Sequence, residues 1–391
     1  MPDEKLRIMI VAGEASGDRH AAKLVRALRE AAGGCETEFF GSAGPLMREA
    51  GVEPVVASDD LSIVGLLEIG RALPMFIGAF RRLTTAARER KPDVAILVDF
   101  PDFNLKLAKS LKRQGIRVVY YISPQVWAWR SYRVATIRKY VDLMITTLPF
   151  EKEWYAKQGV TNVEYVGSPL AREVHPSRSK EEFCDVHEID PARPIVAFLP
   201  GSRHKEIVRI LPEMIEAAIG MTEPRSDLQF VIALAFEKSL ADVKRILHAA
   251  ELRSPLPESL FIIAGETFDV LNASDAAAVT SGTATLETAI IGTPMSIVYK
   301  TSVINYKLLR PLISVEHFGL VNLIAGERVA KEMIQSEFTP LALSRELFQL
   351  LEPERNEAVR MQLSETTKKL GTGGASGRAA QAIMSLLAPN G

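Results

Sequence analysis

The chain has little of what marks secreted, membrane-spanning or metal-binding proteins. Its 391 residues hold only two cysteines, Cys35 and Cys184, a usage typical of reduced thiols in the cytoplasm. No uncharged apolar run reaches 18 residues, so no segment is expected to span a bilayer. The charged start, residues 1–7, does not resemble a signal peptide. These absences predict a cytoplasmic protein.

Charge and histidine give no sign of nucleic acid or of metal. The net charge is −1, so no overall positive field would attract nucleic acid, and we expect no nucleic-acid partner. The six histidines are scattered without the spacing of a zinc site, so we expect no metal. The glycine patterns of dinucleotide-binding and Walker loops are missing as well, and no cofactor is predicted.

Strand-like and helix-like segments alternate along the chain, which predicts an α/β fold with parallel sheets and helices on both faces. The stretch 167–194, rich in Pro, Ser, Arg and Glu, reads as a linker between two doubly wound, Rossmann-like domains. Ligands of such sheets bind at the carboxyl ends of the strands, so a cleft between the domains is the expected site. The predicted division is an N-terminal domain, a C-terminal domain and a helical tail that packs back on the first domain or on a partner chain: residues 1–168, 190–345 and 346–391.

The most informative motif is the run SGTATLE, residues 281–287. It follows an apolar strand-like segment and opens a helix. Small residues at such a turn let backbone N–H groups approach a phosphate, which the helix N-terminus also favours. Glu287 lies one turn further along the helix and could accept hydrogen bonds from a ribose. An ordinary helix capped by Ser281 is the alternative. The predicted diphosphate loop is Ser281, Gly282, Thr283, Ala284 and Thr285.

A second strand, glycine turn and helix unit carries positive charge. The apolar strand 195–199 is followed by PGSRHKE, residues 200–206, which places Arg203 in the turn. A guanidinium offers a planar fork of donors that matches phosphate oxygens. The two turns could face one diphosphate from two sides.

One carboxylate stands out as a candidate base. Asp99 ends the apolar strand 94–98 and begins the run DFPDFN. At the end of a central strand it could accept a proton from a hydroxyl if burial raises its pKa, or it could be an ordinary hydrogen-bond acceptor. Asp102 is expected to cap the helix that follows.

Two further turns in the first half are candidates for the acceptor side of a site. The turn 13–18, with Glu14 and Ser16, precedes a helix and could meet a phosphate. The run YISPQVWAWR, residues 121–130, follows a strand, and its Gln125 and Trp127 could face a sugar. Core packing of the tryptophan is the alternative.

The stretch 61–80 is apolar around much of a helix and leads into a basic segment. Residues 61–91 hold six basic and two acidic side chains. An apolar surface beside basic residues suits an anionic membrane, whereas a buried helical pair with a solvated basic end is the alternative. The candidates for lipid contact are Leu66, Ile69, Leu73, Met75, Phe76, Arg81 and Arg82.

Taken together, six runs resemble the lipid-A-disaccharide synthases, bacterial glycosyltransferases of the GT-B type with two Rossmann-like domains. They are VAGEASGD (11–18), DFPDFN (99–104), YISPQVWAWR (121–130), LPGSRHKEI (199–207), SGTATLE (281–287) and LVNLIAGERVAKEMIQ (320–335).

The resemblance implies an inverting, metal-free transfer of 2,3-diacylglucosamine from its UDP donor to 2,3-diacylglucosamine 1-phosphate, at the inner face of the inner membrane of a Gram-negative bacterium. It also implies peripheral attachment to that anionic surface. Some members of the family form homodimers that exchange C-terminal segments, which fits the helical tail of this chain. Asp99 matches the proposed general base, Arg203 and the 281–287 run match donor contacts, and Asn322 matches an asparagine near the donor.

Two other functions remain open at this point. A UDP-N-acetylglucosamine 2-epimerase has the same architecture and a related phosphate turn, but it would not need the apolar stretch 61–80. A non-catalytic protein that binds a nucleotide-linked lipid would share the binding features and release no UDP.

Overall fold

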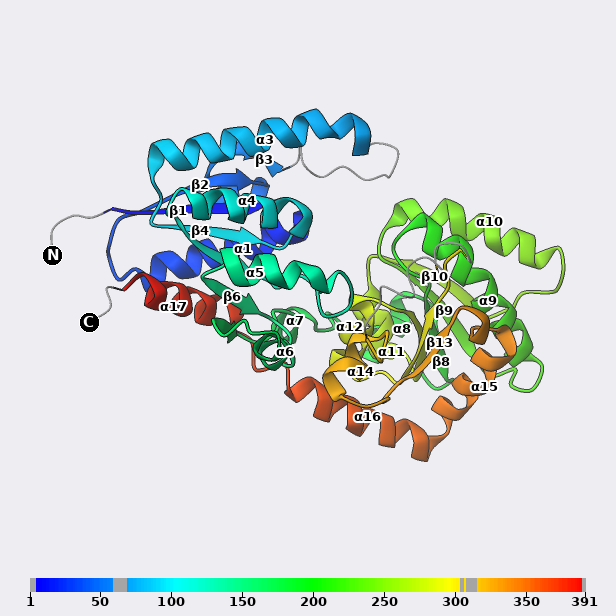
Figure 1. Cartoon of the computed structure of the whole chain (residues 1–391). Coiled ribbons are helices and arrows are strands. Elements are labelled where there is room, and N and C mark those ends of the chain that lie inside the picture. The colour runs from blue at the N-terminus through cyan, green and yellow to red at the C-terminus, as the bar shows by residue number, and fades with distance from the viewer. Residues whose placement is uncertain (1–4, 59–68, 303–305, 307–314, 389–391) are drawn as a thin grey trace. The chain divides into compact units, whose positions relative to one another are not determined.

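The chain folds into two compact units, and the computed structural model describes residues 5–58, 69–302, 306 and 315–388. One unit comprises Met1–Pro169 and Gly373–Gly391, and the other comprises Leu170–Thr372. Each unit is built on one sheet in which all paired strands are parallel. The predicted α/β class, with two doubly wound Rossmann-like halves, is confirmed (Figure 1).

The first unit has a seven-stranded sheet in the order β3-β2-β1-β4-β5-β6-β7. Its central strands are apolar on both faces, as burial between two helix layers requires. The strands are β1 (Leu6–Ala12), β2 (Thr37–Ala43), β3 (Glu53–Ala57), β4 (Val94–Val98), β5 (Arg117–Tyr121), β6 (Leu143–Thr146) and β7 (Val163–Tyr165).

Helices cover both faces of this sheet. Ile8 and Ile10 of β1 pack in a core with α1 and α17, whereas Met9 and Val11 pack on the other face with α3, α4 and α5. The helices are α1 (Ala15–Ala31), α2 (Pro45–Glu49), α3 (Ile69–Arg90), α4 (Pro101–Arg113), α5 (Val134–Tyr140), α6 (Glu151–Lys157) and α17 (Ala375–Leu387).

The second unit has a six-stranded sheet in the order β10-β9-β8-β11-β12-β13 and one continuous apolar core. Its strands are β8 (Ile195–Leu199), β9 (Gln229–Leu234), β10 (Leu260–Ala264), β11 (Ala276–Thr280), β12 (Met295–Tyr299) and β13 (Lys331–Ile334). Helices α9, α10 and α15 pack together, and a second group gathers around α12. The helices are α7 (Leu170–Glu173), α8 (Lys180–Val186), α9 (His204–Thr222), α10 (Leu240–Glu251), α11 (Thr267–Ala273), α12 (Thr283–Ile291), α14 (Leu320–Ala325), α15 (Pro340–Leu351) and α16 (Pro353–Lys368).

The structure differs from the predicted organisation of the chain in three places. The expected linker 167–194 holds α7 and α8, and α8 begins with a capping box formed by Ser179 and Glu182. In the predicted tail 346–391, α16 and the end of α15 belong to the second unit, where their apolar side chains join its core. Only α17 packs in the first unit, against α1. The expected turn 13–18 is helical from Ala15 onward.

A close approach of β1 and β2 in the first sheet depends on a glycine. Gly41 in β2 has a φ of 152°, and a Cβ added there would lie 1.9 Å from the carbonyl oxygen of Ile10. We therefore expect Gly41→Ala to push β1 and β2 apart and to lower the free energy of unfolding by at least about 2 kcal/mol, measured by calorimetry. Gly78→Ala in α3 is the control, because its Cβ would meet nothing within 4 Å. Equal midpoints for the two variants would contradict this account.

Candidate functional site

Asp99 lies at the carboxyl end of β4, where the chain turns into α4. Both Asp99 (φ 46°) and Phe100 (φ 50°) adopt the left-handed conformation, which is rare outside glycine. Phe100 is the N-cap residue of α4. The expectation that Asp102 caps this helix is therefore wrong: Asp102 lies within the first turn and pairs with Arg130 at 3.0 Å and with Arg133.

The environment of Asp99 suits a base that works near neutral pH. Burial and, second to it, the charge of Glu14 raise the pKa of its carboxyl to about 6, although a bond from the backbone of Phe100 opposes both effects. A carboxylate in this range is ionised at pH 7.5 and still accepts protons readily.

The two candidates on α1 are exposed and lie at the start of the helix. Glu14 is the N-cap residue of α1, and Ser16 is in its first turn. The charge of Glu14 acts on the carboxyl of Asp99, so these two predicted candidates lie near each other. Asp18, in contrast, is buried and accepts bonds from the backbone N–H groups of Gly44 and Leu46, both at 2.9 Å. Asp18 therefore joins α1 to α2.

Trp127 does not form an open wall for a sugar. It is 4% exposed, donates from Nε1 to Glu151 at 3.0 Å and packs edge-on against Phe150. Burial raises the pKa of Glu151 to about 7, against the bonds it accepts from Trp127 and the backbone. Exposed side chains of this segment are Gln125 and Trp129, and the guanidinium of Arg130 lies over the Trp129 ring.

In the second unit, the two glycine turns lie on neighbouring strands. β8 and β11 pair in parallel, with Leu199 opposite Val279, and Thr280 Oγ1 donates to the Leu199 carbonyl at 2.9 Å. The turns that follow these strands therefore leave the same edge of the sheet side by side. The predicted neighbourhood of the Arg203 turn and the 281–285 loop is present within this unit.

The N-termini of α9 and α12 differ in how their free backbone N–H groups are hydrogen-bonded. At α9, the carboxylate of Glu206 accepts from the backbone N–H groups of Ser202 and Arg203 and pairs with the Arg203 guanidinium at 2.8 Å. The Glu206 carboxylate thus already satisfies the two backbone N–H groups at this turn. The Arg203 side chain itself is 81% exposed and thus accessible to an anion.

The N-terminus of α12 has no side-chain cap. Gly282 is its N-cap residue, Thr283 is exposed, and Ala284 is half-buried. Ser281 does not cap the helix, because its Oγ donates to the carbonyl of Phe318 at 2.8 Å. Thr285 is buried and bonds back to Gly282. The open amides at the start of α12 are the better anion site of the two turns.

Two polar residues, Glu287 of α12 and Asn322 of α14, have distinct environments. Glu287 is half-buried, and burial raises the pKa of its carboxyl. Asn322 is fully buried: its amide donates to the carbonyl of Ala330 and to Glu332, and its Oδ1 accepts from the N–H of Ala330. Asn322 therefore helps to fix the segment around Phe318, whose carbonyl accepts the hydrogen bond from Ser281.

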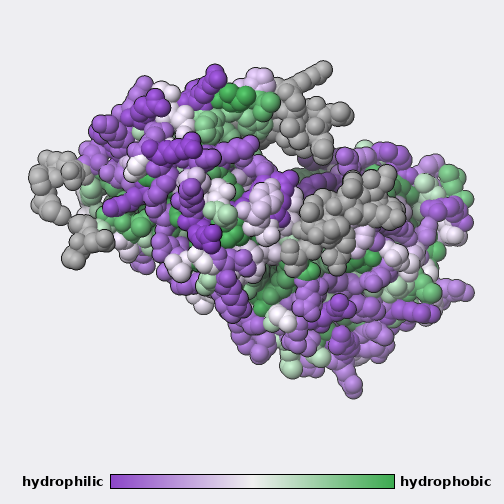
Figure 2. Space-filling model, viewed as in Figure 1, coloured by the Kyte–Doolittle hydropathy of each residue, from purple (hydrophilic) through white to green (hydrophobic). Residues whose placement is uncertain are grey.

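Part of the predicted lipid-contact stretch can be placed. Leu66 lies outside the described residues, and Ile69 begins α3. Leu73 is exposed, as are Arg81 and Arg82, and the unpredicted Ile77 is exposed too; Figure 2 shows hydrophobic surface over this helix. Met75 and Phe76 are half-buried and pack on the core of the first unit, where Phe76 contacts the rings of Phe100 and Phe103.

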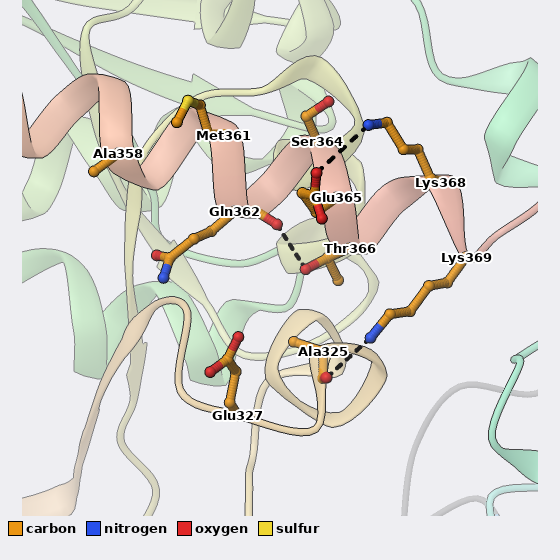
Figure 3. Close-up of a pocket in the computed structure, with 10 residues that line it drawn as sticks. All are labelled: Ala325, Glu327, Ala358, Met361, Gln362, Ser364, Glu365, Thr366, Lys368 and Lys369. Atoms are coloured by element: carbon orange, nitrogen blue, oxygen red, sulfur yellow. Dashed lines mark hydrogen bonds and ion pairs between the residues drawn. The ribbon is translucent and has the colours of Figure 1, made fainter.

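A pocket of about 660 Å³ in the second unit lies away from these groups (Figure 3). It is bounded by the end of α14 and by α16, where Lys369 donates to the carbonyl of Ala325 at 3.0 Å and Lys368 pairs with Glu365. No residue predicted from the sequence lines it. Its mixed charges match no single ligand class, so we assign it no role.

Several polar residues with clear roles were not predicted. Glu206 had a local signal, since it stands three residues after Arg203 as in a capping box. Glu151 and Glu332 had none, because their partners Trp127 and Phe318 are distant in the sequence. In the described ranges, no group of three or more His, Cys, Asp or Glu side chains is arranged to hold a metal ion.

The raised pKa of Asp99 makes a prediction about stability. The folded-state pKa of about 6 exceeds the ordinary 3.8, so the fold loses stability as the pH rises from 3.8 to 6, where the unfolded chain ionises first, and the loss is complete above pH 6. Below pH 3.8 the carboxyl is protonated in both states. Asp99→Asn cannot ionise and should stabilise the fold by on the order of 2 kcal/mol more at pH 8 than at pH 4. Calorimetry at both pH values checks this. An equal effect at pH 4 and pH 8 would contradict it.

Comparison with known proteins gives a consistent family. The lipid-A-disaccharide synthetase family profile matches residues 8–385. The lipid-A-disaccharide synthase of Trichlorobacter lovleyi is 42% identical over 382 residues, which is 97% of each chain. None of the helices in the described part of the chain is long and apolar enough to cross a membrane.

Solved structures support the fold alone. The UDP-GlcNAc 2-epimerase from Neisseria meningitidis, bound to UDP-GlcNAc, has a TM-score of 0.60 at 12% identity, over 97% of this chain and 99% of that one. The calicheamicin glycosyltransferase CalG4 has a TM-score of 0.55 at 16% identity, over 98% of each chain. Since transferases and epimerases share this architecture, the fold does not choose between them. The sequence match does, and the chain belongs to the lipid-A-disaccharide synthase family.

Proposed function

We propose that the chain transfers 2,3-diacylglucosamine from UDP-2,3-diacylglucosamine to 2,3-diacylglucosamine 1-phosphate. The products are the β-1,6-linked disaccharide 1-phosphate and UDP. The proposal rests on two kinds of group. The first unit has a buried carboxylate at the end of a strand, Asp99, and the second unit has the uncapped N-terminus of α12 and the exposed Arg203. Family membership selects this reaction over epimerisation.

The mechanism follows from these groups. Asp99 accepts the proton of the acceptor 6-hydroxyl while that oxygen bonds to C1 of the donor from the face opposite UDP. The bond from C1 to the diphosphate oxygen breaks, so the anomeric configuration inverts. The amides at the start of α12 and the Arg203 guanidinium stabilise the charge that develops on UDP. Glu287 is proposed to bind the ribose, and Asn322 to hold the loop that backs the diphosphate site.

These donors already supply positive charge to the leaving group, so the proposed step uses no metal. Turnover should then be the same with and without EDTA.

The proposed cellular setting is the inner face of the inner membrane of a Gram-negative bacterium, with peripheral attachment. On α3, the exposed Leu73 and Ile77 lie on one helix face with Arg81, since the three are spaced by four residues. Such a face suits an anionic lipid surface. A homodimer is also proposed, in which two copies exchange α17. This helix packs on α1 through its apolar face, and the glycine-rich connection 371–374 precedes it.

The reaction itself is the direct test. Purified protein incubated with both acylated sugars should form the disaccharide and UDP in equal amounts. Feeding UDP-N-acetylglucosamine alone should give no 2-epimer. Epimer formation would support the epimerase alternative, and UDP-sugar binding without any UDP release would support a binding protein.

Removal of the proposed base should affect turnover and not UDP binding. Asp99→Ala should lower kcat by on the order of 10²-fold or more, because the proposed acceptor of the 6-hydroxyl proton is removed. The Kd for UDP, measured by calorimetry, should stay unchanged. Near-normal turnover in this variant would exclude Asp99 as the base.

Removal of the proposed phosphate contact should affect UDP binding. Arg203→Ala should raise the Kd for UDP by about tenfold, the loss of one charge-assisted hydrogen bond. Arg253→Ala is a matched control, because Arg253 is also exposed and pairs with Glu216 at 2.9 Å, as Arg203 pairs with Glu206. The same Kd for the two variants would exclude the Arg203 contact.

A further inference from the structure

The backbone at Asp99 is held in a conformation that side chains disfavour. Asp99 and Phe100 are consecutive non-glycine residues with φ of 46° and 50°. Such a conformation costs free energy at each residue and persists only where the surroundings impose it. Asp tolerates it better than Phe does. The surroundings of this peptide bond should therefore contain the groups that impose it.

Two buried side chains converge on one backbone atom. Tyr120, on the neighbouring strand β5, donates its hydroxyl to the Asp99 carbonyl at 2.6 Å. Asn104, one turn into α4, donates from Nδ2 to the same carbonyl at 2.8 Å and to that of Val98 at 3.2 Å. The Asp99 N–H completes the set by donating to the carbonyl of Tyr121 at 3.1 Å. Both polar groups of the Asp99 backbone are thus fixed.

The donors are well suited to a permanent clamp. Both Tyr120 and Asn104 are 0% exposed, so water does not compete for their bonds. Burial raises the pKa of the Tyr120 hydroxyl well above its ordinary value, which keeps it a donor at working pH. The next residue is fixed by packing: a Cβ added to Gly13 would lie 2.4 Å from the Phe100 ring, so only glycine leaves room for it.

The conformation also redirects the catalytic side chain. In a regular strand, residue 99 would face the same apolar layer as Leu97, because side chains alternate. With the left-handed turn, the Asp99 carboxylate instead lies where the charge of Glu14, the exposed N-cap residue of α1, acts on it. The bonds to the backbone of Asp99 therefore decide where its carboxylate lies.

We propose that Tyr120 and Asn104 are positioning residues that hold the Asp99 backbone in the left-handed conformation and so place its carboxylate for proton transfer. The inference rests on the proposed role of Asp99 as the base. Neither residue needs to touch substrate, since each acts through the carbonyl of Asp99.

The main test is Tyr120→Phe, which removes one oxygen and keeps the ring. We expect kcat with both acylated sugars to fall about five- to tenfold, the effect of one hydrogen bond, while the KM for the UDP donor is unchanged. Tyr155→Phe is the matched control, because Tyr155 is also fully buried in the core that holds Tyr120, and its hydroxyl bonds to Ser123 at 2.9 Å and not to Asp99. Its kcat should equal that of the unaltered protein.

A double-mutant cycle separates positioning from general loosening of the fold. If Tyr120 acts through the Asp99 carboxylate, Tyr120→Phe should not lower the residual kcat of Asp99→Ala any further. Asn104→Leu should behave in the same way and serves as a second variant. An equal fall of kcat in both backgrounds, or an unchanged kcat in Tyr120→Phe, would overturn the inference.

These experiments distinguish failure of the positioning role of Tyr120 and Asn104 from failure of the proposed function. Normal turnover in Asp99→Ala would remove the base itself. A slow Asp99→Ala together with a normal Tyr120→Phe would leave the base in place and exclude only the clamp.

Discussion

The parallel pairing of every described strand is the constraint on which the rest of this structure depends. Parallel strands place all their carboxyl ends at one edge of a sheet, and the turns that leave that edge are the ones that can carry a site. In the first unit this puts Asp99 after β4 and the 122–130 segment after the adjacent β5. In the second unit it puts the Arg203 turn beside the start of α12. Neither arrangement requires residues that are close in sequence.

Polar residues that are buried or half-buried then decide which backbone groups of each turn are already hydrogen-bonded. Glu206 closes the N-terminus of α9 and leaves the α12 amides as the open anion site. The Glu332 carboxylate accepts from the N–H groups of Phe318 and Gly319, and so holds the segment that Ser281 anchors. Burying such a charge is costly unless several donors satisfy it, so each of these carboxylates implies a fixed local geometry. The chemistry assigned to the exposed groups depends on this inner layer of bonds.

The sequence predicted the local units well because their signals are local. The apolar runs that end at Val98, Leu199 and Thr280, each with a turn and a helix behind it, give the strand-turn-helix units that the structure contains. It missed β2, β3, β7 and β13. Three of them begin with polar residues, Thr37, Glu53 and Lys331, and β7 is only three residues long. Weak strands of this kind form because a neighbouring strand pairs with them.

The site was harder to predict than the fold. Asp102 was misplaced because its partner Arg133 stands 31 residues away, and the sequence left open whether Trp127 faces a sugar or packs in the core because its partner Glu151 stands 24 residues away. The left-handed turn at Asp99 could not be foreseen either, since it depends on Tyr120 from another strand.

The most direct test of this account is a crystal structure of the protein with UDP. The account predicts that the diphosphate lies within hydrogen-bonding distance of the first amides of α12 and of the Arg203 guanidinium. A nucleotide bound instead in the pocket between α14 and α16, or anywhere else away from the edge where β8 and β11 end, would contradict it.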